Sequence, residues 1–138
     1  MKTRFIASVL ALLAFPAFGQ NRFQEGELKG LTISRDEHIM NEVREPFIVR
    51  SVEGNVSLND HDDMLPGVLI EIRGPGEELT ILSAITDKNG HFRIKNVQPG
   101  KYMFKTTLAG FQSEYGHITV SKQAPKGNRI QLALHVGV

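Results

Sequence analysis

The 138-residue sequence contains no cysteine, no tryptophan and only two tyrosines. Without cysteine the chain forms no disulfide, offers no thiolate to a metal and has no thiol for nucleophilic catalysis or lipid attachment. The lack of tryptophan leaves few rings suited to stacking on a sugar. Beyond residue 20 no apolar run is long enough to cross a membrane as a helix.

Residues 1–19 have the form of a secretory signal peptide. Two basic residues begin the segment, residues 5–15 are mostly apolar, and small side chains occupy Ala17 and Gly19. The apolar run is well short of the roughly 20 residues that a spanning helix needs, so we expect cleavage after Gly19 rather than a retained anchor. The mature chain, beginning at Gln20, is expected to be soluble and secreted or periplasmic.

Charge argues against a nucleic-acid or membrane partner. The leader holds Lys2 and Arg4 and no acidic residue, so its removal would leave 14 of the 16 basic residues against 15 acidic ones and change the net charge from +1 to −1. No basic block remains in the rest of the chain. The sequence therefore predicts no nucleic-acid binding and no attraction to anionic lipid.

Three turn motifs follow one another along the chain. They are Leu-Pro-Gly-Val at 65–68, Thr-Asp-x-Asn-Gly-x-Phe at 86–92 and Val-Gln-Pro-Gly-x-Tyr at 97–102. Asn-Gly and Pro-Gly reverse a chain because glycine accepts positive φ and proline presets φ for a turn. Their order resembles the carboxypeptidase regulatory-like domain, a transthyretin-like (prealbumin-like) β-sandwich, over roughly Val52 to Leu134.

Alternating apolar and polar residues predict seven short strands within residues 47–138, the number and spacing of an all-β, Greek-key β-sandwich. The polar members of these strands, including Glu71, Arg73, Arg93 and Lys95, are expected to face water. The residues expected to face the core are Val52, Val56, Leu58, Val68, Ile70, Ile72, Phe92, Ile94, Tyr102, Phe104, Thr106, Leu108, Ile118, Val120, Ile130, Leu132 and Leu134.

Residues 20–46 form a polar, charge-mixed arm that lies outside the resemblance. Ser34 and Glu37 have the Ser-x-x-Glu spacing of a capping box, which would place Ile39, Met40 and Val43 on one face of a short helix. We interpret the arm as a short helix or an arm that lies against the sandwich or is partly disordered. A partner-binding helix is the alternative.

Metal and cofactor sites are not indicated. The acidic turn Asp60–Asp63 and the pair Asp87 and Asn89 could offer oxygen ligands to Ca²⁺, but the EF-hand pattern is absent and these residue types favour turns. No two histidines have the i, i+2 or i, i+4 spacing of a zinc site. We therefore predict no metal and no cofactor at any of these positions.

No catalytic pattern is present either. The sequence lacks a Gly-x-Ser-x-Gly elbow and any recognisable serine, acid and histidine order. The transthyretin fold includes a hydrolase lineage acting on 5-hydroxyisourate, whose members end in a Tyr-Arg-Gly-Ser-like tail. This sequence ends with residues 134–138, Leu-His-Val-Gly-Val, so the resemblance does not carry that activity over, and we expect a non-catalytic protein.

A ligand site, if present, is expected around Tyr115 with Phe111 and His117. This is the one aromatic cluster near a predicted loop, and carbohydrate-binding modules of similar shape stack sugars on exposed rings. The sequence leaves the alternative open that Tyr115 packs over the edge of the sandwich with its hydroxyl at water.

The resemblance favours an interaction module, because in larger proteins such domains accompany catalytic domains or outer-membrane receptors as folding or interaction modules. We expect the chain to bind another envelope or extracellular component through an edge strand, a loop cluster or its arm. A carbohydrate-binding module that binds a glycan is the alternative, and a transthyretin-like hydrolase is the least favoured.

Overall fold

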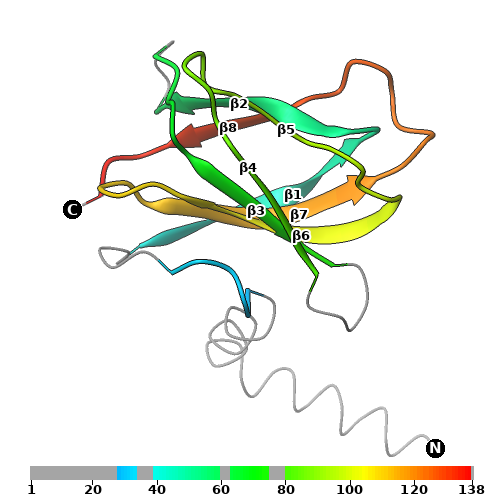
Figure 1. The fold of residues 1–138 in the computed structure, drawn as a ribbon, viewed down its shortest axis with the longest axis horizontal. Coiled ribbons are helices and arrows are strands. Elements are labelled where there is room, and N and C mark those ends of the chain that lie inside the picture. Colours follow the sequence, from blue (N-terminus) through cyan, green and yellow to red (C-terminus); the bar gives the residue numbers. More distant parts are fainter. Residues whose placement is uncertain (1–27, 34–38, 60–62, 75–79, 138) are drawn as a thin grey trace, which may run out of the picture.

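Eight strands form two sheets in the computed structural model of the protein, which describes residues 28–33, 39–59, 63–74 and 80–137 (Figure 1). No helix occurs among these residues, so the prediction of an all-β fold is confirmed, and the eighth strand corrects the expected number of seven. The strands are β1 (Met40–Val49), β2 (Val52–Leu58), β3 (Leu69–Arg73), β4 (Ile81–Ile85), β5 (His91–Ile94), β6 (Gly100–Thr107), β7 (Ser113–Val120) and β8 (Ile130–Leu134).

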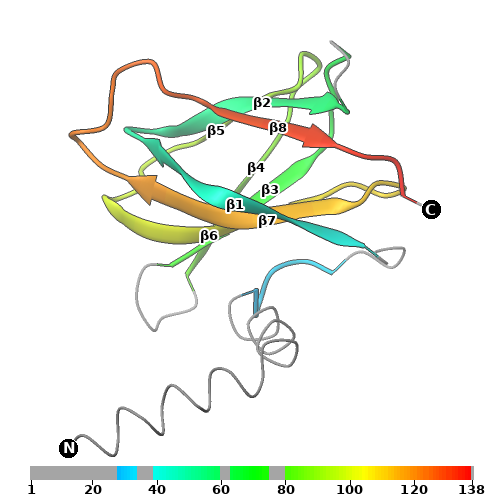
Figure 2. The same cartoon turned by 180° about the vertical axis from the view of Figure 1, so that it is seen from behind.

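The larger sheet has the order β1-β7-β6-β3-β4, and the smaller sheet has the order β5-β2-β8. β1 pairs in parallel with β7, and β2 pairs in parallel with β8, whereas the other neighbours are antiparallel. Arg50 and Ser51 carry the chain from one sheet to the other. Figure 2 shows the two sheets stacked face to face, with β1 and β7 below β2 and β8.

The core lies between the sheets and is made by the residues that the alternating pattern predicts. Phe104, Ile70, Val56 and Leu134 are fully buried, and Phe92 is 2% exposed. Of the expected inward residues, Leu58 and Leu108 are only partly buried. Burial of aliphatic and aromatic side chains from both sheets supplies most of the stability of such a fold, at about 25 cal/mol per Å² of apolar surface.

The Thr-Asp-x-Asn-Gly-x-Phe motif forms the tight turn between β4 and β5, which belong to different sheets. The hydroxyl of buried Thr86 accepts from the Val68 backbone N–H (2.8 Å) and donates to the Leu65 carbonyl (2.6 Å). The turn is thereby tied to the segment that precedes β3. The motif therefore joins the two sheets as well as reversing the chain.

The Asp87 carboxylate closes the same turn. It accepts from the backbone N–H groups of Asn89 (2.9 Å) and His91 (3.0 Å), and these two bonds hold the pKa of the Asp87 carboxyl below its usual value. Gly90 has a φ of +73° there, and a Cβ would lie 2.7 Å from the Val56 carbonyl oxygen. Only glycine fits that position. The pair Asp87 and Asn89 therefore has the structural role that the turn demands.

The third turn motif, Val-Gln-Pro-Gly-x-Tyr, anchors the start of β6. The Tyr102 hydroxyl donates to the Gln98 carbonyl (2.6 Å), and the ring is buried in the core. Burial raises the pKa of the Tyr102 hydroxyl. The expectation that Tyr102 faces inward is confirmed.

The prediction that the polar arm extends to residue 46 is wrong for residues 40–46. Residues 40–46 belong to β1, where the strand pairs with β7 from Met40↔Ser113 onward, and so Met40 and Val43 are not on a helix. Pairing with β7 supplies backbone partners that a short isolated helix lacks, which outweighs the weak local helix signal. The capping-box residues Ser34 and Glu37 lie outside the described residues, as does the predicted leader.

Residues 28–33 lie on the outer face of the five-stranded sheet, on the side away from the smaller sheet (Figures 1 and 2). Leu31 is buried there, 5% exposed. Thr32 donates from its backbone N–H and its hydroxyl to Glu71 of β3, and the ammonium of Lys105 in β6 donates to the Thr32 carbonyl (2.6 Å). We refer to residues 28–33 as the strap.

The strap overturns one expectation. Glu71 was expected to face water, yet it is 7% exposed, and Lys105 beside it is 2% exposed. Glu71 and Lys105 are register partners on neighbouring strands. Because the strap covers this part of the sheet and supplies polar partners, both charged side chains are accommodated without facing bulk water.

Candidate interaction surfaces

The outer edge of β4 is an uncharged strand edge. At one end of β4 the Thr86 N–H donates to the Val68 carbonyl, and at the other end the Thr80 carbonyl accepts from the Gly74 N–H, so both residues direct backbone groups toward the β3 side. Since alternate residues of a strand point to opposite sides, the N–H and C=O groups of Ile81, Ser83 and Ile85 point away from β3. Ser83 is exposed, and Ile85 is 64% exposed.

The opposite edge of the same sheet, β1, is protected. Its pairing with β7 is interrupted between Val43 and Phe47, where the irregularity holds two charged residues and Pro46. The Ile48 carbonyl accepts from the Asn128 side-chain amide (2.9 Å). Bulges, proline and charge are the devices by which natural sheets block edge pairing.

The edges of the smaller sheet are less suitable than β4 for pairing with another strand. β5 is only four residues long and carries the exposed cation Arg93. β8 directs Ile130, Leu132 and Leu134 into the core and has no exposed large apolar side chain. Among the described strands, β4 thus combines an uncharged edge with an exposed apolar side chain.

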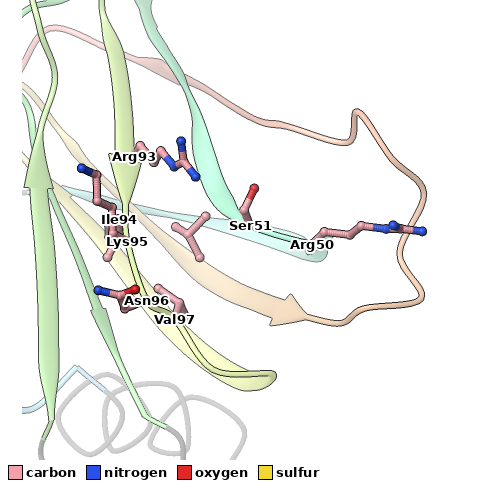
Figure 3. Close-up of a pocket in the computed structure, with 8 residues that line it drawn as sticks. Arg50, Ser51, Arg93, Ile94, Lys95, Asn96 and Val97 are labelled. Atoms are coloured by element: carbon pink, nitrogen blue, oxygen red, sulfur yellow. The ribbon is translucent and has the colours of Figure 1, made fainter.

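A pocket of about 250 Å³ lies where the chain enters β2 and leaves β5. Figure 3 shows its labelled residues, with Arg50 extending away from the others. The Arg50 Nε donates to the Ala124 carbonyl (2.5 Å), so this guanidinium is anchored to the β7–β8 loop. The residues that line the pocket are Arg50, Ser51, Val52, Arg93, Ile94, Lys95, Asn96 and Val97.

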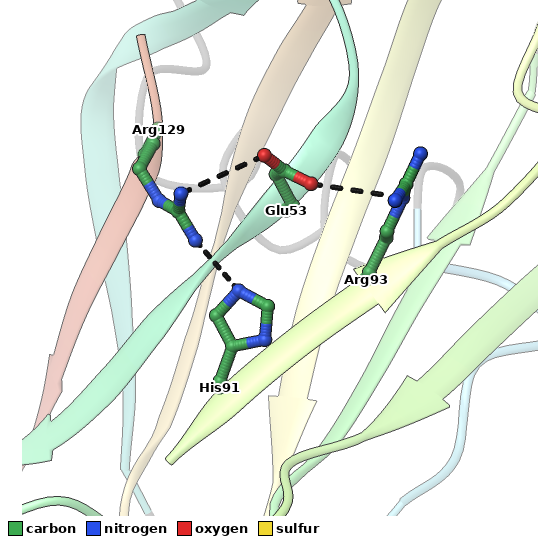
Figure 4. Close-up of polar contacts among 4 residues, drawn as sticks. All are labelled: Glu53, His91, Arg93 and Arg129. Atoms are coloured by element: carbon green, nitrogen blue, oxygen red, sulfur yellow. Dashed lines mark hydrogen bonds and ion pairs between the residues drawn. The ribbon is translucent and has the colours of Figure 1, made fainter. Parts of the chain in front are cut away.

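A charged cluster lies beside this pocket on the outer face of the smaller sheet (Figure 4). Glu53 contacts Arg93 on one side (3.6 Å) and Arg129 on the other (3.7 Å). Arg129 also donates to His91 Nε2 (2.6 Å). Because arginine has no acceptor, His91 receives this bond through an unprotonated Nε2. The Glu53 carboxylate therefore forms ion pairs with two guanidinium groups.

The predicted aromatic site has a different form in the structure. Tyr115 is 6% exposed and lies within β7, so the ring is packed, as the alternative for Tyr115 has it, and is not the exposed ring that the carbohydrate-binding alternative requires. Phe111 is partly buried and packs against the core, whereas His117 is on the outer face of β7 and also partly buried. Tyr115 lies beside its register partner Lys105, which donates to the Thr32 carbonyl of the strap.

The histidines and acidic residues that the structure describes are not gathered into a metal site. Residues 60–62 of the acidic turn lie outside the described residues. Within the part of the chain that the structure describes, no group of three histidine, aspartate or glutamate side chains is placed to hold a metal. Nor does that part contain a helix long and apolar enough to cross a membrane.

Besides Glu71, sequence reasoning missed a second buried acid, Glu114 of β7. It is 9% exposed, and its Oε2 has no hydrogen-bond partner among the described residues. Burial raises the pKa of the Glu114 carboxyl, and the Asn41 side chain and the nearby His135 partly oppose the rise. The sequence holds a signal for this burial, because Glu114 is in phase with the inward residues Ile118 and Val120 and the two-residue period therefore places it on the same face of β7.

The fold is an all-β sandwich, and comparison with known protein families identifies the family of this chain. Residues 51–134 match the family model of the carboxypeptidase regulatory-like domain, and the chain belongs to that family. The boundaries agree with the resemblance expected from the turn motifs. No match was found among curated proteins.

Three solved structures are similar at low identity. A chain of an N-terminal interface mutant of a type II cohesin–X-dockerin complex from Acetivibrio cellulolyticus is 22% identical, with 63% of this chain and 58% of that chain covered and a TM-score of 0.44. A chain of the C-terminal interface mutant of that complex is 25% identical, with 64% of this chain and 55% of that chain covered and a TM-score of 0.39. Chlorocatechol 1,2-dioxygenase from Pseudomonas putida is 12% identical, with 100% of this chain and 90% of that chain covered and a TM-score of 0.43.

This chain therefore spans less than two thirds of the two cohesin–X-dockerin chains that it matches. All three TM-scores are below 0.5. No binding partner or catalytic property of these proteins is transferred to this chain.

Proposed function

We propose that this protein is a non-catalytic interaction module that binds an extended segment of a partner protein by strand addition at β4. The observation that carries the proposal is the outer edge of β4, where three residues direct backbone groups away from β3 and Ile85 is 64% exposed. A partner strand would satisfy those groups and cover Ile85, and backbone pairing of this kind supplies affinity.

The contrast between the two edges of the larger sheet supports this choice. β1 carries charge, Pro46 and the Asn128 bond to Ile48, whereas Ile81–Ile85 contains no charged residue and no proline. Edges left without such protection are templates for another strand. We further propose that the partner is an envelope or extracellular protein, since residues 1–19 have the form of a secretory signal peptide.

Sugar binding at Tyr115, Phe111 and His117 has less support. Tyr115 is buried, and stacking needs an accessible ring face. A hydrolase also has less support, because it would need a pocket of convergent titratable groups, and the lining of the pocket beside β5 includes three cations and no acid.

The test compares two matched variants, Ile85→Lys on β4 and Ile48→Lys on β1. Both side chains are about half exposed or more, so neither change should disturb the core. Affinity purification from the native host with quantitative mass spectrometry should recover a partner with the wild type and with Ile48→Lys, and lose it with Ile85→Lys. Equal recovery with both variants would contradict strand addition at β4.

A further inference from the structure

The sequence of β4 is nearly symmetric about its middle residue. Residues 81–85 read Ile-Leu-Ser-Ala-Ile, with isoleucine at both ends and an aliphatic residue on each side of Ser83. The residues that direct backbone groups away from β3, which are Ile81, Ser83 and Ile85, are spaced evenly about Ser83. A two-fold axis at Ser83 would therefore place each of them opposite a residue of the same kind in a second copy of the strand.

Antiparallel pairing about this axis gives every outward backbone group of β4 a partner. Ser83 lies opposite Ser83 of the second copy, and at each end Ile81 lies opposite Ile85. In pairs of this kind the two facing residues exchange both of their N–H and C=O bonds. No outward donor or acceptor within β4 is then left without a partner, so the strand is complementary to itself.

The side chains of two paired copies also complement one another. Leu82 and Ala84 face the core, and both are partly buried. In this register the larger Leu82 of each copy lies opposite the smaller Ala84 of the other, so no two large side chains oppose each other on the core side. On the outer face Ile85, which is 64% exposed, is covered by Ile81 of the second copy. Covering it removes apolar surface from water.

Pairing of this kind ends at two copies. It joins two larger sheets at their β4 edges and leaves β1 at both outer edges of the combined sheet. β1 is the edge protected by Pro46, by the irregularity between Val43 and Phe47, and by the bond from Asn128 to Ile48. A contact between identical patches about a two-fold axis is closed, so it forms a dimer and no filament.

We propose that two copies of this protein associate through their β4 strands, paired antiparallel about Ser83. The inference rests on the proposed function, because it uses the same open edge, and it names the occupant of that edge when no partner is bound. Two five-residue strands form a smaller interface than the roughly 1,200 Å² of stable complexes, so we expect a Kd on the order of 0.1–1 mM. At micromolar concentration the edge is free, and a partner strand competes with the second copy for the same backbone groups.

The first experiment is NMR spectroscopy of the purified wild-type chain at concentrations above and below this Kd. The amide signals of Ile81, Ser83 and Ile85 should shift in a saturable manner with concentration, while those of β1 should not. A mixture of isotope-labelled and unlabelled chains then reports the register. Because Cα atoms approach most closely in facing pairs without hydrogen bonds, an intermolecular NOE is expected between the Hα atoms of Leu82 and Ala84.

Two charge variants test the two-fold axis itself. Ser83 is exposed, so Ser83→Lys and Ser83→Glu should both fold, which the amide spectrum verifies. Each variant alone places like charges opposite each other and should associate about tenfold more weakly than the wild type. An equimolar mixture should recover the affinity, because opposite charges then face each other. Ile48→Lys, on the protected β1 edge, is the control and should associate like the wild type.

Three results would overturn the proposal. They are a wild type without concentration-dependent shifts in β4, an intermolecular NOE between other residues in place of Leu82 and Ala84, and a mixture of the charge variants that associates no better than either alone.

The dimer and the proposed function fail in different experiments. A wild type that stays monomeric, while Ile85→Lys still loses the partner, would reject the dimer and leave strand addition standing. A dimer with the expected NOE, together with equal partner recovery by Ile85→Lys and Ile48→Lys, would instead reject the proposed function.

Discussion

Glu71 accepts two hydrogen bonds from Thr32, one from the backbone N–H at 2.8 Å and one from the hydroxyl at 3.0 Å, although 39 residues separate them in sequence. With the bond from Lys105 to the Thr32 carbonyl, every polar group of one strap residue has a charged partner on the sheet. Bonds to charged groups are about twice as strong as neutral ones. This residue therefore fixes the strap on the sheet.

Replacing Glu71 should release the strap. Glu71→Gln removes the negative charge and one of the two acceptors, and we expect a loss of about 1–3 kcal/mol in the free energy of unfolding. Thr32→Ala should cost a similar amount, and the double variant little more than either. A double-mutant cycle in urea measures this coupling, and fully additive losses would contradict the contact.

Thr86 should matter more than an ordinary threonine. Thr86→Val keeps the shape of the side chain but leaves the Val68 N–H without the hydroxyl and the Leu65 carbonyl without a donor. We expect a loss of about 1–3 kcal/mol, measured by thermal or urea unfolding. Thr119→Val, on the outer face of β7, is the control and should change stability by less than about 0.5 kcal/mol.

Gly54 should not tolerate a side chain. A Cβ there would lie 1.7 Å from the Ile130 carbonyl oxygen, so Gly54→Ala must push β2 and β8 apart. We expect a loss of about 3 kcal/mol or more, or failure to fold. Ser57→Ala in the same strand is the control. A cooperative unfolding transition for Gly54→Ala at the wild-type midpoint would show that the two strands are not this close.

The stability of the protein should respond to pH through Glu114. Because burial raises the pKa of this carboxyl in the folded state, the ionised form is disfavoured there, and its contribution to stability decreases as the pH rises above the ordinary value of 4.5. Glu114→Gln cannot ionise. The free energy of unfolding of the variant minus that of the wild type should therefore increase from pH about 4 to about 7. A difference that is flat with pH would contradict the raised pKa.

The turns and the core could be predicted from the sequence because their signals are local. Gly90 and Thr86 occupy positions that the turn between β4 and β5 requires. The strands after residue 51 alternate with period two, and this period predicts nearly every inward residue correctly. These signals depend on a few neighbouring residues, so they can be recognised in the sequence without knowing the fold.

The outer face of the larger sheet could not be predicted in this way. Glu71 occupies a polar position of an alternating strand, and nothing near it in sequence shows that a segment 39 residues earlier covers it. Residues 40–46 form a strand because β1 pairs with β7, about 70 residues later in the sequence. Tyr115 is buried beside Lys105, which bonds to the strap. The β4 edge likewise becomes visible only when the strand order is known.

Hydrogen exchange of the protein, alone and with its recovered partner, tests the central claim most directly. Strand addition predicts that the amides of Ile81, Ser83 and Ile85 exchange more slowly in the complex, because they gain backbone partners, while the amides of β1 are unchanged. Slowed exchange confined to the region of Phe111, Tyr115 and His117, with β4 unaffected, would contradict the claim and favour the aromatic site.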